Sequence, residues 1–235
     1  MRIVDLSHPI EEGMPVYPGT QPPSVRLASA VAEHGFAERI LTLTTHTGTH
    51  VDVPAHLLAG GKTLDDFPVA RFLGRAAVVD ATGCVGRTIG LGDLEPSRQA
   101  ILGSRFVLLH TGWSRYWGRD AYFQGFPVLD LEAAAWLAAQ GLGGVGVDAP
   151  SVDPMDGGAD GSYPVHRVLL EGGMVIVENL TDLHLLPQEG AVFACFPLPV
   201  RGGDGAPVRA VAFFGAAGWV TGAFGLREEG GADPG

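Results

Sequence analysis

The stretch His46-Thr-Gly-Thr-His50-Val-Asp52-Val-Pro-Ala-His56 holds three histidines and one aspartate within eleven residues. All four side chains occupy even positions, and side chains of equal parity project from the same face of an extended strand. The β-branched residues in and before this stretch favour a strand, whereas a helix would be broken by Pro54 and would turn Asp52 away from His50. The sequence therefore predicts an extended segment with His46, His50, Asp52 and His56 on one face.

These side chains have the chemistry of a metal site. Two neutral imidazoles and a carboxylate form a suitable ligand set for Zn²⁺ or Mn²⁺. Burying such groups together without a cation would be electrostatically costly. Gly48 carries no side chain on the ligand face and leaves room for an ion or a close backbone. We therefore interpret the cluster as metal-binding rather than structural.

Short apolar runs rich in β-branched residues recur on both sides of this stretch and predict strands. They cover Ile3–Leu6, Leu41–Thr45, Ala76–Asp80, Phe106–His110, Gly144–Val147, Met174–Val177, Val192–Phe196 and Val208–Phe214. The segment Leu129–Ala139 has helical spacing, with Asp130 as its N-cap and Gly141 after its end. Many strands with few helices predict an α/β (α+β) fold with one mixed, barrel-like sheet and peripheral helices.

Length and composition limit the organisation and the partners of the chain. Its 235 residues, 46% of them hydrophobic, suffice for one substantial core. We expect a single domain over residues 1–227 and a flexible tail over residues 228–235, which are small and polar. The net charge of −11 and the lack of a basic run argue against nucleic-acid binding. Without a signal-like segment or a run of about 20 apolar residues, we expect no membrane partner and a cytoplasmic protein.

A second set of candidate ligands lies later in the chain. His166 precedes a short apolar run that could form a helical turn, and Glu178 closes the apolar strand Met174–Val177. Alone, each residue fits a capping or surface role as well as a ligand role. The strand Gly144–Val147 ends in a polar loop where Asp148 and Ser151 either line a pocket or shape a turn. The roles of His8 and His110 stay similarly open.

The segment His46–His56 resembles the HxGTHxDxPxH signature of the cyclase family of metal-dependent hydrolases, which includes bacterial kynurenine formamidases and isatin hydrolases. The similarity extends over most of the chain. It includes the loop around Tyr17, the segment from Gly146 to Pro154, the twelve-residue spacing of His166 and Glu178, and the C-terminal strands.

The resemblance implies a swivelling β/β/α fold, a homodimer or homotetramer, and one or two ions of Zn²⁺ or Mn²⁺ per chain. It implies that His46, His50 and Asp52 bind one metal, and that Asp52 bridges to a second. His166 and Glu178 would hold the second ion, and His56 would be the general acid/base. Tyr17 stands where kynurenine formamidases carry a substrate-packing tryptophan, and it offers a smaller ring for the same role.

These observations predict a metal-dependent hydrolase that cleaves an amide C–N bond of a small molecule. The favoured substrate is an N-formyl arylamine such as N-formylkynurenine, with His56 moving the proton to the leaving nitrogen. The alternative is hydrolysis of a cyclic amide or a lactone. A metal-binding protein without turnover is a third possibility, but a spare histidine beside a complete ligand set argues against it.

Overall fold

The computed structural model describes residues 1–158 and 161–215. The expected tail 228–235 and the last part of the expected domain, residues 216–227, lie outside the described residues. The strands are β1 Arg2–Asp5, β2 Ser24–Ser29, β3 Glu38–Thr42, β4 His50–Asp52, β5 Leu73–Asp80, β6 Phe106–His110, β7 Gly144–Val147, β8 Val175–Glu178, β9 Ala191–Pro197 and β10 Gly205–Phe214. The α-helices are α1 Val31–His34, α2 Leu91–Leu94, α3 Arg98–Leu102, α4 Leu131–Ala138 and α5 Pro164–Glu171.

Eight strands form one mixed sheet in the order β1-β10-β4-β8-β7-β6-β5-β9. Strand β10 also pairs with β9, so the sheet from β10 round to β9 closes on itself and β1 is added outside the ring. The neighbours β5, β6, β7 and β8 run parallel, and the other pairings are antiparallel. This confirms the predicted mixed, barrel-like sheet.

The strands in the centre of the sheet are buried on both faces, as continuous apolar runs predict. Phe106 and Leu108 belong to the core inside the barrel. Val107 and Leu109 face the opposite way and belong to the core beneath the helices. Because successive side chains of a strand alternate, one strand contributes to two separate cores.

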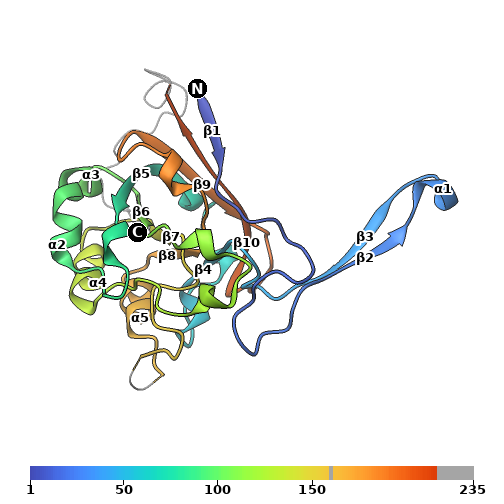
Figure 1. Cartoon of the computed structure of the whole chain (residues 1–235), viewed down its shortest axis with the longest axis horizontal. Coiled ribbons are helices and arrows are strands. Elements are labelled where there is room, and N and C mark those ends of the chain that lie inside the picture. Colours follow the sequence, from blue (N-terminus) through green and yellow to red (C-terminus); the bar gives the residue numbers. More distant parts are fainter. Residues whose placement is uncertain (159–160, 216–235) are drawn as a thin grey trace.

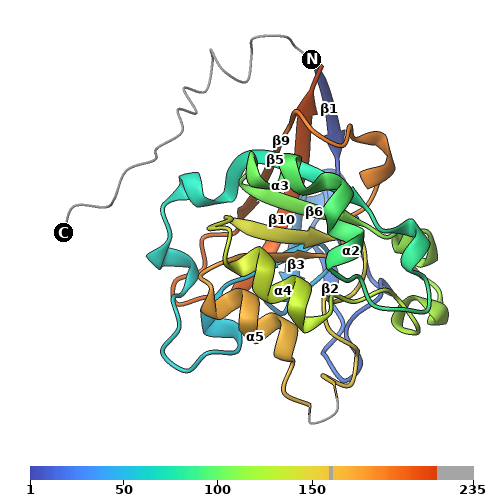
Figure 2. The same cartoon turned by 90° about the vertical axis from the view of Figure 1, so that its left-hand side faces the viewer.

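Helices α2 to α5 gather on the side of the barrel opposite the β2–β3 hairpin (Figure 1), and Figure 2 views the molecule from this helical side. The predicted helix Leu129–Ala139 is confirmed as α4, in which Asp130 accepts a 2.7 Å hydrogen bond from the backbone N–H of Ala133. The expected helical turn at His166 is a longer element, α5, which begins at Pro164. Proline suits the first position of a helix, where no N–H is needed.

The prediction of one extended strand from His46 to His56 is wrong. His46 lies in a turn, only His50–Asp52 is strand β4, and His56 ends a short 3₁₀ helix formed by Pro54–His56. The chain leaves the extended conformation at Gly48, whose φ of 65° is left-handed. It leaves it again at Pro54, which starts a helical turn. The four side chains therefore converge from three local conformations rather than from one strand face.

Strand β2 had no counterpart in the sequence prediction, and β3 begins and ends earlier than the predicted strand Leu41–Thr45. The two strands pair with each other as a separate two-stranded sheet that projects from the barrel (Figure 1). The residues of β3 are all exposed, so the run lacks the burial pattern of the barrel strands. Among the described residues, no helix has the length and apolar character needed to span a membrane.

Candidate metal centre

Sheet pairing assembles the centre of the site. In the antiparallel pair β4–β8, His50 lies directly opposite Glu178, and on the other side of β4, Asp52 lies opposite Gly205 of β10. Helix α5 carries His166, which is buried, as are His50, Asp52 and Glu178. The second candidate pair and the first motif therefore meet in space, as the prediction of a shared site required.

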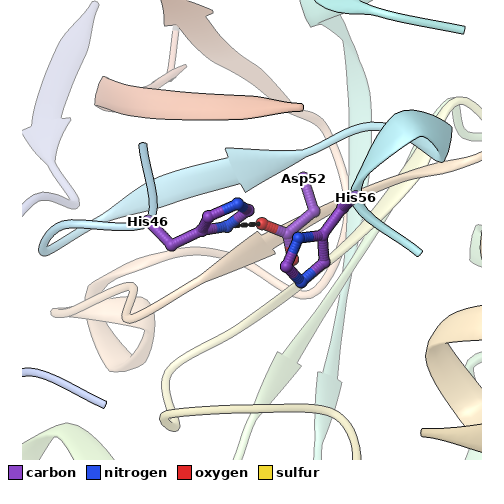
Figure 3. A group of neighbouring side chains, drawn as sticks. All are labelled: His46, Asp52 and His56. Atoms are coloured by element: carbon purple, nitrogen blue, oxygen red, sulfur yellow. Dashed lines mark hydrogen bonds and ion pairs between the residues drawn. The ribbon is translucent and has the colours of Figure 1, made fainter. Parts of the chain in front are cut away.

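His46 reaches the cluster from the turn before β4. Its Nδ1–H donates a 2.7 Å hydrogen bond to Oδ1 of Asp52, and its Nε2–H points to Oδ2 of Asp204 at 3.0 Å. Figure 3 shows the His46 ring joined to the Asp52 carboxylate by the first of these contacts, with the His56 ring close to the same carboxylate. Burial lowers the pKa of His46, but the carboxylates of Asp52 and Asp204 outweigh it and raise the pKa to about 9.

His50 is oriented by the backbone next to it. Its Nδ1–H donates a 2.9 Å hydrogen bond to the carbonyl of Gly48, which also accepts one from Asn179. This fixes the tautomer and leaves Nε2 facing the cluster, 3.2 Å from Asp52 Oδ1 and 3.5 Å from Glu178 Oε2. An imidazole held through one nitrogen with the other free is the usual arrangement of a metal-binding histidine.

His166 shows the same arrangement with a carboxylate as its partner. Its Nδ1–H donates a 2.7 Å hydrogen bond to Oδ2 of Asp153, while Nε2 lies 3.1 Å from Glu178 Oε1 and 3.7 Å from Asp52 Oδ2. Asp153 also accepts hydrogen bonds from the backbone N–H groups of Val165 and His166 at the start of α5. It therefore fixes both the helix and the ring.

Two carboxylate oxygens at the centre of the cluster are buried and accept no well-aligned hydrogen bond. They are Asp52 Oδ2 and Glu178 Oε1. Buried polar atoms are normally paired, and an unpaired ionised carboxylate oxygen is especially costly. Three imidazole nitrogens and these oxygens face one another, with the ligand atoms of His50, Asp52 and Glu178 all within 4.8 Å. This donor set fits a divalent cation.

The electrostatics of the cluster agree with that fit. Burial alone would raise the pKa of Asp52, but the charges of His50 and His46 hold it well below the ordinary value. Burial likewise opposes the charge on His166, yet the hydrogen bond to Asp153 and the nearby carboxylates of Asp52 and Glu178 raise its pKa well above the ordinary value. Protons on His46 and His166 supply positive charge beside the carboxylates, and a bound cation would take their place.

His56 lies at the rim of the cluster and is half-buried. Its ring centroid is 4.0 Å from that of His46 and 6.2 Å from that of His166. Burial lowers the pKa of His56, so its imidazole favours the neutral form. The ligand atoms of His46, Asp52 and His56 lie within 4.8 Å of one another, so the geometry also permits His56 as a ligand.

Asp204 and Asp153 contact the candidate ligands, but the sequence reasoning assigned neither of them a role. Asp204 precedes β10 and lies 158 positions from His46. Asp153 lies in the loop after β7, thirteen positions before His166. No spacing rule links either residue to its histidine. The sequence offered no signal for Asp204 beyond its position shortly before the predicted strand Val208–Phe214.

A cavity of about 260 Å³ opens in front of the cluster. Tyr17 lies in its wall, so the structure brings this predicted substrate-binding residue to the site. The residues that line the cavity are Pro15, Val16, Tyr17, Thr20, Thr44, His46, Gly48, His50, His56, Leu57, Phe123, Pro150, Ser151, Tyr163, His166, Glu178 and Asn179. Most of the wall is apolar, which suits an aromatic ring next to the polar cluster.

The residues whose roles the sequence left open divide between the cavity and the scaffold. Ser151 lines the cavity. Asp148 shapes a turn instead, because its carboxylate accepts hydrogen bonds from the backbone N–H groups of Thr111 and Gly112. His8 stacks on Trp117, with ring centroids 3.9 Å apart and planes within 3°.

His110 ends β6, and the structure gives it no position in the cavity wall. Its ring centroid lies 6.4 Å from that of His184.

Comparison with known proteins places this site in a family. Residues 4–154, more than half of the chain, match the family model Cyclase, described as "Putative cyclase". The chain is 33% identical over 209 residues to the kynurenine formamidase of Geobacillus thermodenitrificans, covering 88% of this chain and 95% of that one. The matched range contains His46, His50, Asp52, His56 and Asp153.

Solved structures agree with the sequence matches. Isatin hydrolase A from Labrenzia aggregata superimposes with a TM-score of 0.79 at 27% identity, covering 90% of this chain and 93% of that one. A structure described as a potential metal-dependent hydrolase with cyclase activity gives a TM-score of 0.72 at 29% identity, covering 92% and 98% of the two chains. The chain therefore belongs to the cyclase family, as its metal-ligand motif and closed mixed sheet indicated.

Proposed function

We propose that this protein is a metal-dependent hydrolase of aryl formamides, with N-formylkynurenine or a close analogue as its substrate. The observation that carries the proposal is the pair of buried carboxylate oxygens, on Asp52 and Glu178, that accept no hydrogen bond while three imidazoles surround them. Such a cluster is stable as the ligand set of a cation. It opens into a cavity whose apolar wall fits an aromatic substrate.

The related proteins support the class of reaction more strongly than they support a particular substrate. A hydrolase of C–N bonds other than peptide bonds is confirmed, because the relatives are named kynurenine formamidase and isatin hydrolase. For the substrate we favour an open-chain formamide over a cyclic amide. The kynurenine formamidase is 33% identical to this chain, whereas the isatin hydrolase is 27% identical.

The ligand assignment follows the contacts in the cluster. His46, His50 and Asp52 would hold one Zn²⁺ or Mn²⁺ ion, and Asp52 would share a second ion with His166 and Glu178. The outer nitrogens of the three histidines are already engaged, by Asp204, Gly48 and Asp153 respectively. This leaves one nitrogen of each ring for the cation and holds each ring in place.

The ion, when bound, would supply a Lewis acid that activates water and polarises the formyl carbonyl. The side chains of this protein would do the rest. Leu57, Phe123 and Tyr17 would pack on the aryl ring and exclude water from it. His56 would accept a proton from the attacking water, and its lowered pKa favours the neutral base that this step needs.

The same proton completes the reaction. Water oxygen attacks the formyl carbon, the C–N bond breaks, and His56 returns the proton to the leaving nitrogen, so that formate and a free arylamine result. Nδ1 of His56 lies 3.7 Å from Asp204 Oδ2. Nε2 is therefore the nitrogen that we assign to the proton transfer.

The test combines metal analysis with three substrates. The purified protein should contain one or two divalent ions per chain, lose activity with a chelator, and regain it with Zn²⁺ or Mn²⁺. The metal-replete protein should release formate from N-formylkynurenine faster than it opens isatin or an aryl lactone. Faster turnover of isatin would replace the formamide substrate with a cyclic amide, and full activity without metal would overturn the proposal.

We also propose that the protein is a cytoplasmic homodimer or homotetramer. The projecting β2–β3 hairpin supports self-association, because it exposes large apolar side chains that water solvates poorly. These are Leu27, Val31, Phe36, Ile40 and Leu41. The two cysteines, Cys84 and Cys195, are free and buried, which suits a reducing compartment. Light scattering on the eluting protein and cell fractionation test the two statements.

A further inference from the structure

Two phenols, those of Tyr17 and Tyr163, form part of the cavity wall. Tyr17 lies in the loop before β2, and Tyr163 stands directly before α5, 146 positions later in the chain. Their hydroxyl oxygens are 2.8 Å apart. The mechanism proposed above uses the ring of Tyr17 but neither hydroxyl, so this polar pair has no assigned purpose.

The hydroxyl protons of the pair have one consistent arrangement. Tyr17 must donate its proton to the backbone carbonyl of Met155, because a carbonyl only accepts. The contact between the two phenols then needs the proton of Tyr163, which donates to the oxygen of Tyr17. No other hydrogen bond joins either phenol oxygen to the described residues. Tyr163 therefore presents unused lone pairs, and the pair acts as an acceptor toward the cavity.

The cavity wall offers the phenol pair no basic side chain as a partner. None of the residues that line the cavity is lysine or arginine. Burial, the bond to Tyr163 and the carboxylates of Glu178 and Asp156 all raise the pKa of Tyr17 above its ordinary value. Tyr17 thus stays neutral and keeps its proton for the carbonyl of Met155.

The backbone of Tyr163 is held in an unusual conformation at this point. Its φ of 52° and ψ of 61° are left-handed, which is rare for a residue other than glycine. The following Pro164 disfavours helical backbone angles at Tyr163 further. A 3.0 Å hydrogen bond from its N–H to the carbonyl of Gly157 helps to hold it. Strained residues of this kind concentrate at ligand sites, and here the strain accompanies a phenol aimed at Tyr17.

We propose that Tyr163, supported by Tyr17, binds the ammonium group of the substrate and so selects aryl formamides that carry a primary amine. The inference rests on the proposed function in one respect, that the substrate is an aryl formamide. An ammonium group offers three donors and no acceptor, which matches the exposed lone pairs. Hydrogen bonds to a charged donor are also stronger than neutral ones.

The decisive variant is Tyr163→Phe, which removes one oxygen and keeps the ring. The two substrates are N-formylkynurenine and its analogue with hydrogen in place of the ammonium group. We expect KM for N-formylkynurenine to rise about tenfold, the loss typical of a hydrogen bond to a charged group. We expect kcat to change little, and both constants for the analogue to stay at their wild-type values.

Two further variants sharpen the comparison. Tyr17→Phe removes the acceptor that directs the proton of Tyr163, so it should weaken the same discrimination. Tyr116→Phe is the matched control, since this phenol lies outside the cavity wall and its oxygen contacts Arg115. The control should discriminate between the two substrates as the wild type does.

Binding separates this inference from the proposed function. Calorimetry with kynurenine and its deamino analogue measures the ammonium preference without any turnover. If the wild type hydrolyses neither formamide, the proposed function fails. The difference in affinity between kynurenine and its deamino analogue still tests whether the phenol pair binds an ammonium group. The inference is overturned if Tyr163→Phe binds both ligands as the wild type does, or weakens both equally.

Discussion

The carboxylate of Asp204 lies 3.0 Å from Nε2 of His46 and 3.7 Å from Nδ1 of His56. One partly exposed acid thus touches both a candidate metal ligand and the candidate proton carrier. In this position Asp204 can hold the ring of His46 with Nδ1 toward Asp52 and limit the rotation of His56. Such partners of a ligand commonly affect metal affinity and activity together.

Replacing Asp204 with asparagine should therefore weaken the site without removing a ligand. We expect the metal affinity to fall about 10–100-fold, the range found for partners that orient metal ligands. Competition with a chelating dye measures this directly. Glu171→Gln at the exposed end of α5 is the control for loss of one negative charge. An Asp204→Asn protein with wild-type affinity and turnover would show that this contact is incidental.

Asp153→Asn should affect the other end of the cluster. The substitution keeps one acceptor oxygen but sets an amide donor against the Nδ1–H of His166. We expect bound metal to fall toward one ion per chain. The loss of one buried, charged acceptor should lower the free energy of unfolding by about 1–3 kcal/mol. Elemental analysis and denaturant unfolding check the two effects, and unchanged metal content would contradict the role of Asp153.

His50→Ala removes a proposed ligand at the centre of the site. Bound metal and activity should disappear together, because the variant keeps only two of the three proposed protein ligands of the first ion. Metal titration followed by formate release provides the measurement. Full metal retention with normal turnover would remove His50 from the ligand set.

His56→Ala should separate proton transfer from metal binding. Metal content should stay close to the wild-type value, while turnover of an amide should fall about 10²–10⁴-fold, the usual contribution of a general acid/base. An ester with a good leaving group should lose less, because its departure needs less protonation. A large loss of metal instead would identify His56 as a ligand, which the 4.8 Å cluster with His46 and Asp52 permits.

The stability of the fold should depend on pH through His8. Burial lowers the pKa of His8 from 6.5 to about 4, so the folded state keeps it neutral while the unfolded chain protonates near pH 6.5. Stability from this group is complete above pH 6.5 and is lost as the pH falls toward 4. Denaturant unfolding at pH 7 and pH 4.5 gives the free energy of unfolding at each pH. The difference between these two free energies should be smaller for His8→Phe than for the wild type. An identical pH dependence in both proteins would exclude His8 as its source.

The sequence by itself determined the features that depend on residues close together in the chain. Continuous apolar runs such as Phe106–His110 specified barrel strands, because a strand buried on both faces needs apolar residues at every position. The motif from His46 to His56 specified a metal site because its ligands are close in the chain. Local reasoning nevertheless gave the wrong conformation for the motif, since Gly48 and Pro54 break the strand on either side of β4.

Only the tertiary structure decided which distant residues complete the site. The pairing of His50 with Glu178 and of Asp52 with Gly205 brings β8 and β10 alongside the motif, and Asp204 arrives with β10. Sheet register depends on how whole strands bury their apolar faces, so no short sequence pattern encodes it. The contact of Tyr17 with Tyr163 likewise exists because the folded chain joins a loop before β2 to the start of α5.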